Sequence, residues 1–158
     1  MSPGIEAPKI CGETPEVIVM PGHTVYLEAA DRTQALLDIK WTLKSAGFRI
    51  RSTWHEGQAS LLTSKSKDHW NVRSVEQLQR CDSLVVICEN NDRAAPEVAM
   101  MAGVALARGL EVIWIGPLVG PLSAFEAVRQ FDTAEHYRTQ ILQQMYFRPL
   151  STAERLAA

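Results

Sequence analysis

Stretches of consecutive hydrophobic residues alternate along the chain with stretches in which apolar residues mark one side of a helix. The clearest hydrophobic run is residues 83–88, which follow Asp82 and predict a strand buried on both faces. After a polar loop, Pro96 stands where the first position of a helix is expected. Residues 98–107 are all apolar or Gly, so we expect this helix to be buried on every side and to end at Gly109.

Before this central unit, the pattern predicts a strand, a helix and a second strand. Residues 23–28 have the β-branched and aromatic content of a core strand, in which Tyr26 is assigned to the core. Asp31 is the expected N-cap of a helix that ends at Gly47, and residues 48–54 alternate as a strand does. The apolar face of the expected helix consists of Ala35, Leu36, Ile39, Leu43 and Ala46.

The remaining elements continue the same alternation. We expect a helix over residues 72–79, a strand over 111–115 and a short helix over 123–129. A last amphipathic helix is expected from its cap, Thr133, to about residue 145. The predicted fold class is therefore α/β: a three-layer, doubly wound, flavodoxin- or Rossmann-like sheet of about five mainly parallel strands with helices on both faces.

The length of 158 residues is enough for one domain with a sizeable core and too short for two. Residues 1–22 are dense in proline and glycine, which predicts a flexible N-terminal leader. Residues 23–148 form the single expected α/β domain, and residues 149–158 are expected to be a C-terminal tail.

Composition narrows the classes of partner. Hydrophobic residues make up 46% of the chain, charged residues 22%, and the net charge is -2. The chain lacks the positive charge that would favour binding to nucleic acid or to a membrane surface. No apolar run approaches the roughly 20 residues of a membrane span. Three cysteines without a CxxC spacing argue against a disulfide framework and a zinc site. We therefore expect a cytoplasmic protein that binds no nucleic acid, membrane or metal.

Phosphate-binding and hydrolase motifs are absent from the sequence. The turn after the first predicted strand begins at Glu28 and contains no GxGxxG, and no GxxxxGK[ST] or GxSxG occurs. A Rossmann dinucleotide enzyme, a P-loop NTPase and an α/β-hydrolase are thus not supported. We expect no bound cofactor.

Glu97 is the best candidate for chemistry. It lies in the first turn of the helix that follows the central strand, at the edge where open α/β sheets bind ligands. Unpaired N–H groups and the helix dipole favour its ionised form there, and a fixed carboxylate can attack an electrophilic sugar carbon. The alternative is that this glutamate only stabilises the helix, as acidic residues in first turns commonly do.

Other polar and aromatic side chains follow the predicted strands. Asp92 is either a loop residue that bonds its own backbone or a ligand-binding group. Trp54 and His55 can stack on or hydrogen-bond a base, although Trp54 fits the core equally well. The candidate substrate-binding residues in these positions are Asp92, Asn90, Glu28, His55 and Trp54.

Three motifs, in this order along the chain, resemble the nucleoside 2-deoxyribosyltransferase-like superfamily. The first is a strand with a small-residue turn, residues 25–30, and the second is an Asp followed by an apolar strand, residues 78–86. The third is Glu97 followed by Gly-x-Ala-x-Ala-x-Gly at residues 103–109. The resemblance covers roughly residues 24–116.

The resemblance implies that Glu97 is a nucleophile that forms a glycosyl-enzyme intermediate, and that Asp92 helps to bind the sugar or base. Ser74 stands where the family carries another catalytic aspartate, so Ser74 is a further candidate at the substrate site and the proton for the leaving base has to come from another group. Asp68, in the polar loop of residues 58–70, is a candidate for that role. The resemblance also implies a homo-oligomer.

The first functional hypothesis is N-glycosidic bond cleavage or 2-deoxyribosyl transfer on a nucleoside or nucleotide through a glutamate nucleophile. One alternative is a non-catalytic nucleotide-binding or sensing module on the same fold, which the serine at position 74 favours. Another is a TIR-like NAD glycohydrolase, since such enzymes also use a glutamate against a ribosyl bond. Three measurements distinguish the hypotheses. Release of free base indicates glycosidic cleavage, nucleotide binding without turnover indicates the binding module, and release of nicotinamide from NAD indicates the TIR-like enzyme.

Overall fold

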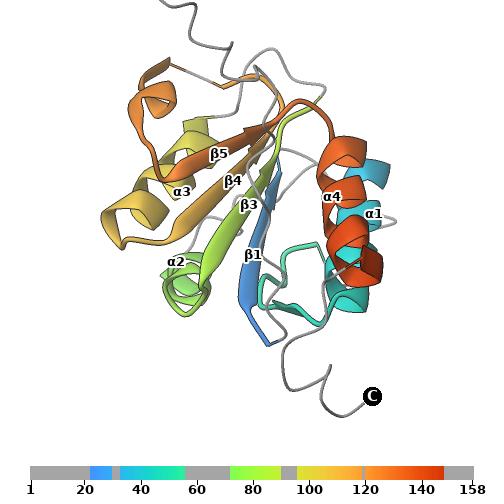
Figure 1. The fold of residues 1–158 in the computed structure, drawn as a ribbon. Coiled ribbons are helices and arrows are strands. Elements are labelled where there is room, and N and C mark those ends of the chain that lie inside the picture. The colour runs from blue at the N-terminus through green and yellow to red at the C-terminus, as the bar shows by residue number, and fades with distance from the viewer. Residues whose placement is uncertain (1–21, 30–32, 56–71, 90–95, 119, 148–158) are drawn as a thin grey trace, which may run out of the picture.

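The computed structural model describes residues 22–29, 33–55, 72–89, 96–118 and 120–147. Within them, five strands form one sheet in which every pairing is parallel and the strand order is β2-β1-β3-β4-β5 (Figure 1). The order of the strands across the sheet therefore reverses between β1 and β3. The strands are β1 (Thr24–Ala29), β2 (Arg49–Ile50), β3 (Ser83–Ile87), β4 (Glu111–Ile115) and β5 (Val128–Phe131).

Four α-helices of the described residues cover the sheet, two on each face (Figure 1). α1 and α4 pack on one face, whereas α2 and α3 pack on the other. This is the three-layer, doubly wound parallel sheet that the alternation of elements predicts, with the strand order of flavodoxin-like folds. The helices are α1 (Gln34–Ser45), α2 (Val72–Gln79), α3 (Pro96–Ala107) and α4 (Ala134–Phe147), and a short 3-10 helix, η3, covers Gly120–Ala124.

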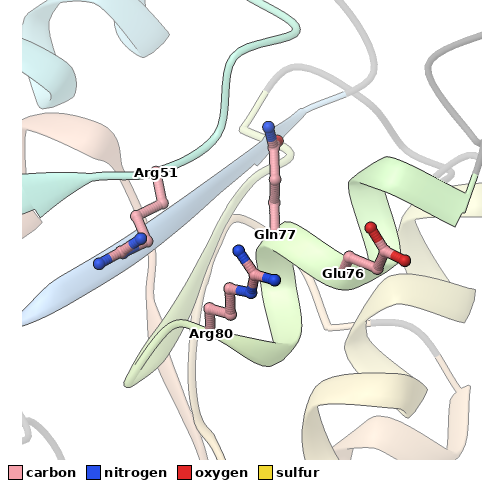
Figure 2. A pocket seen from close by; sticks show the side chains of 4 residues that line it. All are labelled: Arg51, Glu76, Gln77 and Arg80. Atoms are coloured by element: carbon pink, nitrogen blue, oxygen red, sulfur yellow. The ribbon is translucent and has the colours of Figure 1, made fainter.

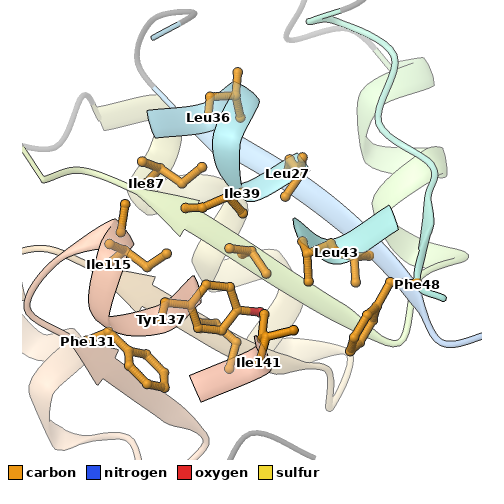
Figure 3. Close-up of a cluster of buried hydrophobic side chains, with 14 of the residues drawn as sticks. Leu27, Leu36, Ile39, Leu43, Phe48, Ile87, Ile115, Phe131, Tyr137 and Ile141 are labelled. Atoms are coloured by element: carbon orange, nitrogen blue, oxygen red, sulfur yellow. The ribbon is translucent and has the colours of Figure 1, made fainter. Parts of the chain in front are cut away.

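The central strands are apolar on both sides because each face of the sheet meets a layer of helices. In β1, Val25, Leu27 and Ala29 join the core beneath α1 and α4, whereas Tyr26 joins the core beneath α2 and α3. β3 is buried at every position. Figure 3 shows the first of these cores, in which Leu27 lies among side chains of both helices. These side chains include Leu36, Ile39 and Leu43 of α1 and Tyr137 and Ile141 of α4.

The expected strand of residues 48–54 is a strand only at β2, because side chains then replace its backbone pairing with β1. The backbone ladder stops where Arg51 N donates to β1 at 3.0 Å. Beyond this point the Ser52 hydroxyl accepts from Leu27 N at 3.0 Å, and the Trp54 indole N–H donates to the Leu27 carbonyl at 2.7 Å. The alternating pattern is thus real, but its last residues pair with β1 through side chains.

The N-terminal cap of α1 differs from the prediction. Thr33, and not Asp31, is the N-cap, and its hydroxyl accepts from Leu36 N at 3.3 Å. Asp31 itself lies outside the described residues. Both residue types cap helices well, so the choice depends on where the turn places the first helical residue. The predicted end at Gly47 is confirmed, with φ at +91°.

α3 begins at Pro96 and is followed by Gly109 with φ at +72°, as the pattern predicts. The expectation that it is buried on every side is wrong. Met100 is 49% exposed, and Gly103 and Ala107 are exposed as well. The sheet and α2 cover only part of the helix, so an apolar side faces outward in the described structure.

β5 occupies part of the stretch for which the pattern predicts a short helix, residues 123–129. Helical residues occur earlier, in η3, and β5 pairs with β4 at the edge of the sheet. Phe131 is the one buried residue of this edge strand, so the alternation that marks a strand is weak. The predicted cap of the last helix is confirmed, since the Thr133 hydroxyl accepts from His136 N at 3.1 Å.

The described part of the chain also bears on the expected leader, tail and cysteines. None of its helices combines the length and the apolar character needed to cross a membrane. Cys81 and Cys88 are both buried. Nearly all of the expected leader, residues 1–22, and all of the expected tail, residues 149–158, lie outside the described residues.

Candidate functional site

The carboxyl ends of β1 and β3 form the edge where an open α/β sheet of this strand order binds ligands. The connections leave these two strands in opposite directions across the sheet, which opens a crevice between them. Ala29, the last residue of β1, pairs with Ile87, the last residue of β3. α3 begins at Pro96, after the loop that follows β3. Residues at these three positions therefore define the candidate site.

Glu97, the predicted nucleophile, is the second residue of α3. Backbone N–H groups in the first turn of a helix have no intrahelical acceptor and favour a negative charge nearby. The side chain of Glu97 lies outside the described structure, as do Asn90 and Asp92 of the preceding loop. Their roles stay predictions. Asp68, the candidate proton donor, also lies outside the described residues.

Glu28 lies near the carboxyl end of β1 and is fully buried. Because side chains alternate along a strand, Glu28 is on the same face of β1 as Tyr26, which is the face covered by α2 and α3. Its Oε1 accepts a hydrogen bond from Ala29 N at 3.0 Å. Glu28 therefore brings a carboxyl group to the candidate site while it satisfies a backbone donor of β1. Substrate binding by Glu28 stays a prediction.

Tyr26 is a polar group of this face that the sequence pattern assigns to the core. Its side chain is fully buried, and its hydroxyl has no hydrogen-bond partner among the described residues. The nearby side chain of Ser74 on α2 is buried as well and acts on the pKa of Tyr26. The pKa of Tyr26 is raised to about 12, mainly because burial removes water from the hydroxyl. The Ser74 side chain lowers this pKa and the charge of Cys81 raises it, and both effects are smaller than that of burial. The Tyr26 hydroxyl is therefore protonated at neutral pH. In the sequence, the two-residue spacing of Tyr26 and Glu28 indicates that both side chains lie on the same face of the strand.

Trp54 and His55 have partners within the protein. The Trp54 indole is bonded to the Leu27 carbonyl and packs edge-on against the His55 ring, with 5.4 Å between ring centroids. His55 is 1% exposed. Its Nε2 lies 2.9 Å from the Ser52 hydroxyl and its Nδ1 lies 3.3 Å from the Lys40 ammonium. Both residues thus support the open edge of β1, and substrate binding by either one stays a prediction.

The tautomer of His55 follows from its neighbours. The Lys40 ammonium can only donate, so Nδ1 of His55 accepts and Nε2 carries the proton. Nε2 then donates to the Ser52 oxygen, which also accepts from Leu27 N. A histidine in this state cannot remove a proton from Ser52. The Ser52–His55 pair is therefore a structural support and not a nucleophile with its base.

Two further contacts fix the carboxyl end of β3. Glu89 Oε2 accepts from Ala134 N, the first residue of α4, at 3.3 Å, where a carboxylate also offsets the helix dipole. Gly116 has φ at +116°, and a Cβ at this position would lie 2.5 Å from the Cys88 carbonyl oxygen. The backbones of β3 and β4 thus approach closely at the site edge. Glycine after a predicted strand is the signal for this contact.

The described part of the site offers hydrogen-bonding groups rather than a cluster of metal ligands. No three His, Cys, Asp or Glu side chains gather there, or elsewhere in the described residues, as a metal ion would require. The groups present are the Glu28 carboxyl and the hydroxyls of Tyr26 and Ser74. Such groups can hold a polar ligand such as a sugar and can share or transfer protons.

Comparison with known proteins gives a similarity of fold. Neither a protein-family model nor a curated protein sequence matches the chain. The structure of Clostridium botulinum CMP N-glycosidase, BcmB, superposes with a TM-score of 0.52 at 14% identity, covering 75% of this chain and 97% of that one. An exopolyphosphatase-related protein from Bacteroides fragilis has a TM-score of 0.48 at 9% identity, covering 78% of this chain and 39% of that one, which is too distant for an argument. The chain therefore shares the α/β fold of an N-glycosidase, and this similarity shows the fold alone.

Proposed function

We propose that this protein cleaves the N-glycosidic bond of a nucleoside or nucleotide, with Glu97 as the nucleophile. The observation that carries the proposal is that Glu97 is in the first turn of α3, the helix that follows β3, and that the strand order reverses between β1 and β3. The similarity of fold to a CMP N-glycosidase, which spans 97% of that chain, supports the same reaction class.

The reaction that we propose proceeds in two displacements. A Glu97 oxygen forms a bond to the anomeric carbon C1′ while the bond from C1′ to the base nitrogen breaks, and the electron pair of that bond goes to the base, which takes up a proton. Water then attacks C1′ of the glycosyl-enzyme ester and regenerates the carboxylate. If a second base attacks instead, the outcome is transfer. Two inversions at C1′ give net retention.

The described groups on the α2 and α3 face suit this chemistry. The Tyr26 hydroxyl keeps its proton at neutral pH and can donate to an anionic or polar partner. Ser74 can hydrogen-bond but is not acidic enough to protonate a leaving base. Glu28 adds a buried carboxyl group to this face, which makes it a candidate for passing a proton to the leaving base beside the predicted Asp68.

The test is base release from a panel of nucleosides, ribonucleoside and deoxyribonucleoside monophosphates and NAD, measured by chromatography. Glu97→Gln keeps the size of the side chain and removes its negative charge, and we expect it to lower turnover by at least about a thousandfold. Glu126→Gln, at an exposed position between η3 and β5, is the matched control and should leave turnover unchanged. Base release that survives in Glu97→Gln would exclude this residue as the nucleophile.

The same panel separates the alternatives. Release of base that accelerates when a second free base is added, with a new nucleoside as product, identifies transfer rather than hydrolysis. Nicotinamide release from NAD alone would favour the TIR-like reaction. Nucleotide binding by calorimetry, with a folded protein that turns over nothing, would favour the non-catalytic module, and the specific observation behind that module is a buried serine at position 74.

A further inference from the structure

A pocket of about 410 Å³ lies beside α2, between this helix and the residues that follow β2 (Figure 2). Arg51, which directly follows β2, forms one wall. Gln77 and Glu76 come from the C-terminal half of α2, and Arg80 comes directly after the helix. Two arginines from segments that are far apart in the sequence therefore line one hollow.

The backbone on both sides of this pocket is held by hydrogen bonds. Arg51 N donates to the Val25 carbonyl at 3.0 Å, which fixes this residue against β1. Arg80 N donates to the Gln77 carbonyl at 3.2 Å and tightens the end of α2. The Gln77 side-chain amide donates to the Thr53 hydroxyl at 3.0 Å and joins the two walls. These hydrogen bonds hold the two walls of the pocket in place.

Neither arginine has an ion pair among the described residues. The nearby Asp82 carboxylate accepts hydrogen bonds at Oδ2 from the backbone N–H and the hydroxyl of Thr24, both at 2.8 Å. These bonds are the main cause of its lowered pKa, and the charge of Arg51 lowers that pKa further, so Asp82 offsets part of the Arg51 charge without an ion pair. Figure 2 shows the Glu76 carboxylate on the far side of Arg80 from Arg51. A cation at the end of a helix is favourable in itself, which accounts for Arg80, but Arg51 lies outside any helix. Two positive charges and one carboxylate line the hollow, so its net charge is positive and favours an anion.

We propose that this pocket binds a phosphate monoester. Guanidinium groups bind phosphate oxygens bidentately, and two of them balance the charge of nearly two units that a phosphate monoester carries at neutral pH. The pocket volume lies within the range of small-molecule sites, so it has room for a nucleotide-sized molecule rather than the phosphate group alone. The carboxylate of Glu76 and the Gln77 amide, which is also bonded to the Thr53 hydroxyl, line the rest of the pocket.

This pocket is separate from the candidate reaction site. It lies toward β2, at the outer edge of the sheet, whereas α3 packs on β3 and β4 in the middle. α2 contacts both β1 and α3 and lies between the two regions. A phosphate monoester here therefore acts as an effector or a second ligand of the protein, and its binding does not depend on the proposed catalytic reaction.

Binding is measured by isothermal titration calorimetry with cytidine monophosphate, inorganic phosphate and cytidine as probes. The Glu97→Gln background prevents consumption of the nucleotide if the proposed reaction occurs. The test variant is Arg51→Gln with Arg80→Gln. The matched control is Arg49→Gln with Arg108→Gln, which removes the same charge from exposed positions outside the pocket lining.

We expect the monophosphate to bind, cytidine to bind at least about tenfold more weakly, and the test variant to lose about tenfold or more of the affinity while the control keeps it. Equal affinity for inorganic phosphate would mean that the phosphate group alone is recognised, and weaker affinity would mean that the pocket also contacts the nucleoside; both support the proposal. Absence of binding by both phosphates overturns it. So does equal weakening in test and control variants, or binding that the test variant leaves intact.

Discussion

Replacement of Gly116 by Ala tests whether the site edge of β3 and β4 depends on a contact that only glycine allows. A Cβ at this position would lie 2.5 Å from the oxygen and 2.7 Å from the carbon of the Cys88 carbonyl. These are backbone atoms held by the sheet, since Cys88 N donates to the Ile115 carbonyl and Gly116 N to the Phe131 carbonyl, both at 2.8 Å. The clash can therefore be relieved only by disturbing the ladder that leads to α3.

The expected loss of stability in Gly116→Ala has two parts. A side chain forced into the positive-φ region, here +116°, costs about 1–3 kcal/mol. Overpacking against neighbours that cannot move adds about 1–3 kcal/mol. The expected loss is thus about 2–6 kcal/mol, against a total stability of about 5–15 kcal/mol for a domain of this kind. Gly116→Ala should be strongly destabilised or unfolded at room temperature.

The assay is urea unfolding followed by circular dichroism, with two further glycines as references. Gly109 also has positive φ, +72°, but a Cβ there meets no atom within 4 Å, so Gly109→Ala reports backbone strain alone. Gly103 lies inside α3 with open space around it, so Gly103→Ala should stabilise the helix by about 0.5–1 kcal/mol. If Gly116→Ala loses no more stability than Gly109→Ala, the clash with Cys88 does not exist.

Three further substitutions test the supports of β1. Trp54→Phe keeps an aromatic side chain but leaves the Leu27 carbonyl without its indole N–H donor. This variant should lower the free energy of unfolding by about 1–3 kcal/mol in the same urea assay. Ser52→Ala removes the acceptor of the Leu27 N–H and should cost a similar amount, and a loss below about 0.5 kcal/mol for either variant would mean that water replaces the side chain. Asp82→Asn tests a pH effect. Hydrogen bonds from the backbone and side chain of Thr24 hold the pKa of Asp82 in the folded protein below its usual 3.8. The ionised Asp82 therefore stabilises the fold above its pKa in the unfolded chain, and this stabilisation is lost as the pH falls through its pKa in the folded protein. Thermal unfolding from pH 7 to 2 should show the wild-type advantage over Asp82→Asn shrinking below about pH 4, and an advantage that is constant with pH would contradict the assignment.

Most of the fold could be predicted because the apolar pattern of the central strands in the sequence agrees with their burial in the structure. β3 is apolar at each position, and in the structure both of its faces are covered. The pattern failed where one side of an element is exposed. β5 buries only Phe131, so its strand signal is weak, and α3 is apolar on an outward side that includes Met100, which composition alone cannot distinguish from a core side.

The candidate site could be predicted in position but not in its full set of residues. Glu97 stands out in the sequence because it is a carboxylate at the start of an otherwise apolar helix, and in the structure it is in the first turn of the helix that follows β3. Tyr26 was assigned to the core, correctly as to burial, but its hydroxyl and Ser74 are brought together by the packing of α2 on β1. Contacts between residues so far apart in the sequence leave no local pattern. The two-residue spacing of Tyr26 and Glu28, in contrast, indicates that both side chains lie on the same face of the strand.

The short length of β2 links the support of β1 to the candidate site. If β2 ran to residue 54, a strand would flank β1 up to its carboxyl end, and the backbone of that strand would bond Leu27 and Ala29. Instead Ser52 and Trp54 bond Leu27, and the Glu28 carboxylate bonds Ala29 N. The Glu28 carboxyl group thus accepts a bond that a strand neighbour would otherwise accept, and it is buried at the candidate edge of the sheet. If Glu28 takes part in the proposed reaction, Trp54→Phe should reduce turnover as well as stability, because both depend on the same open edge of β1.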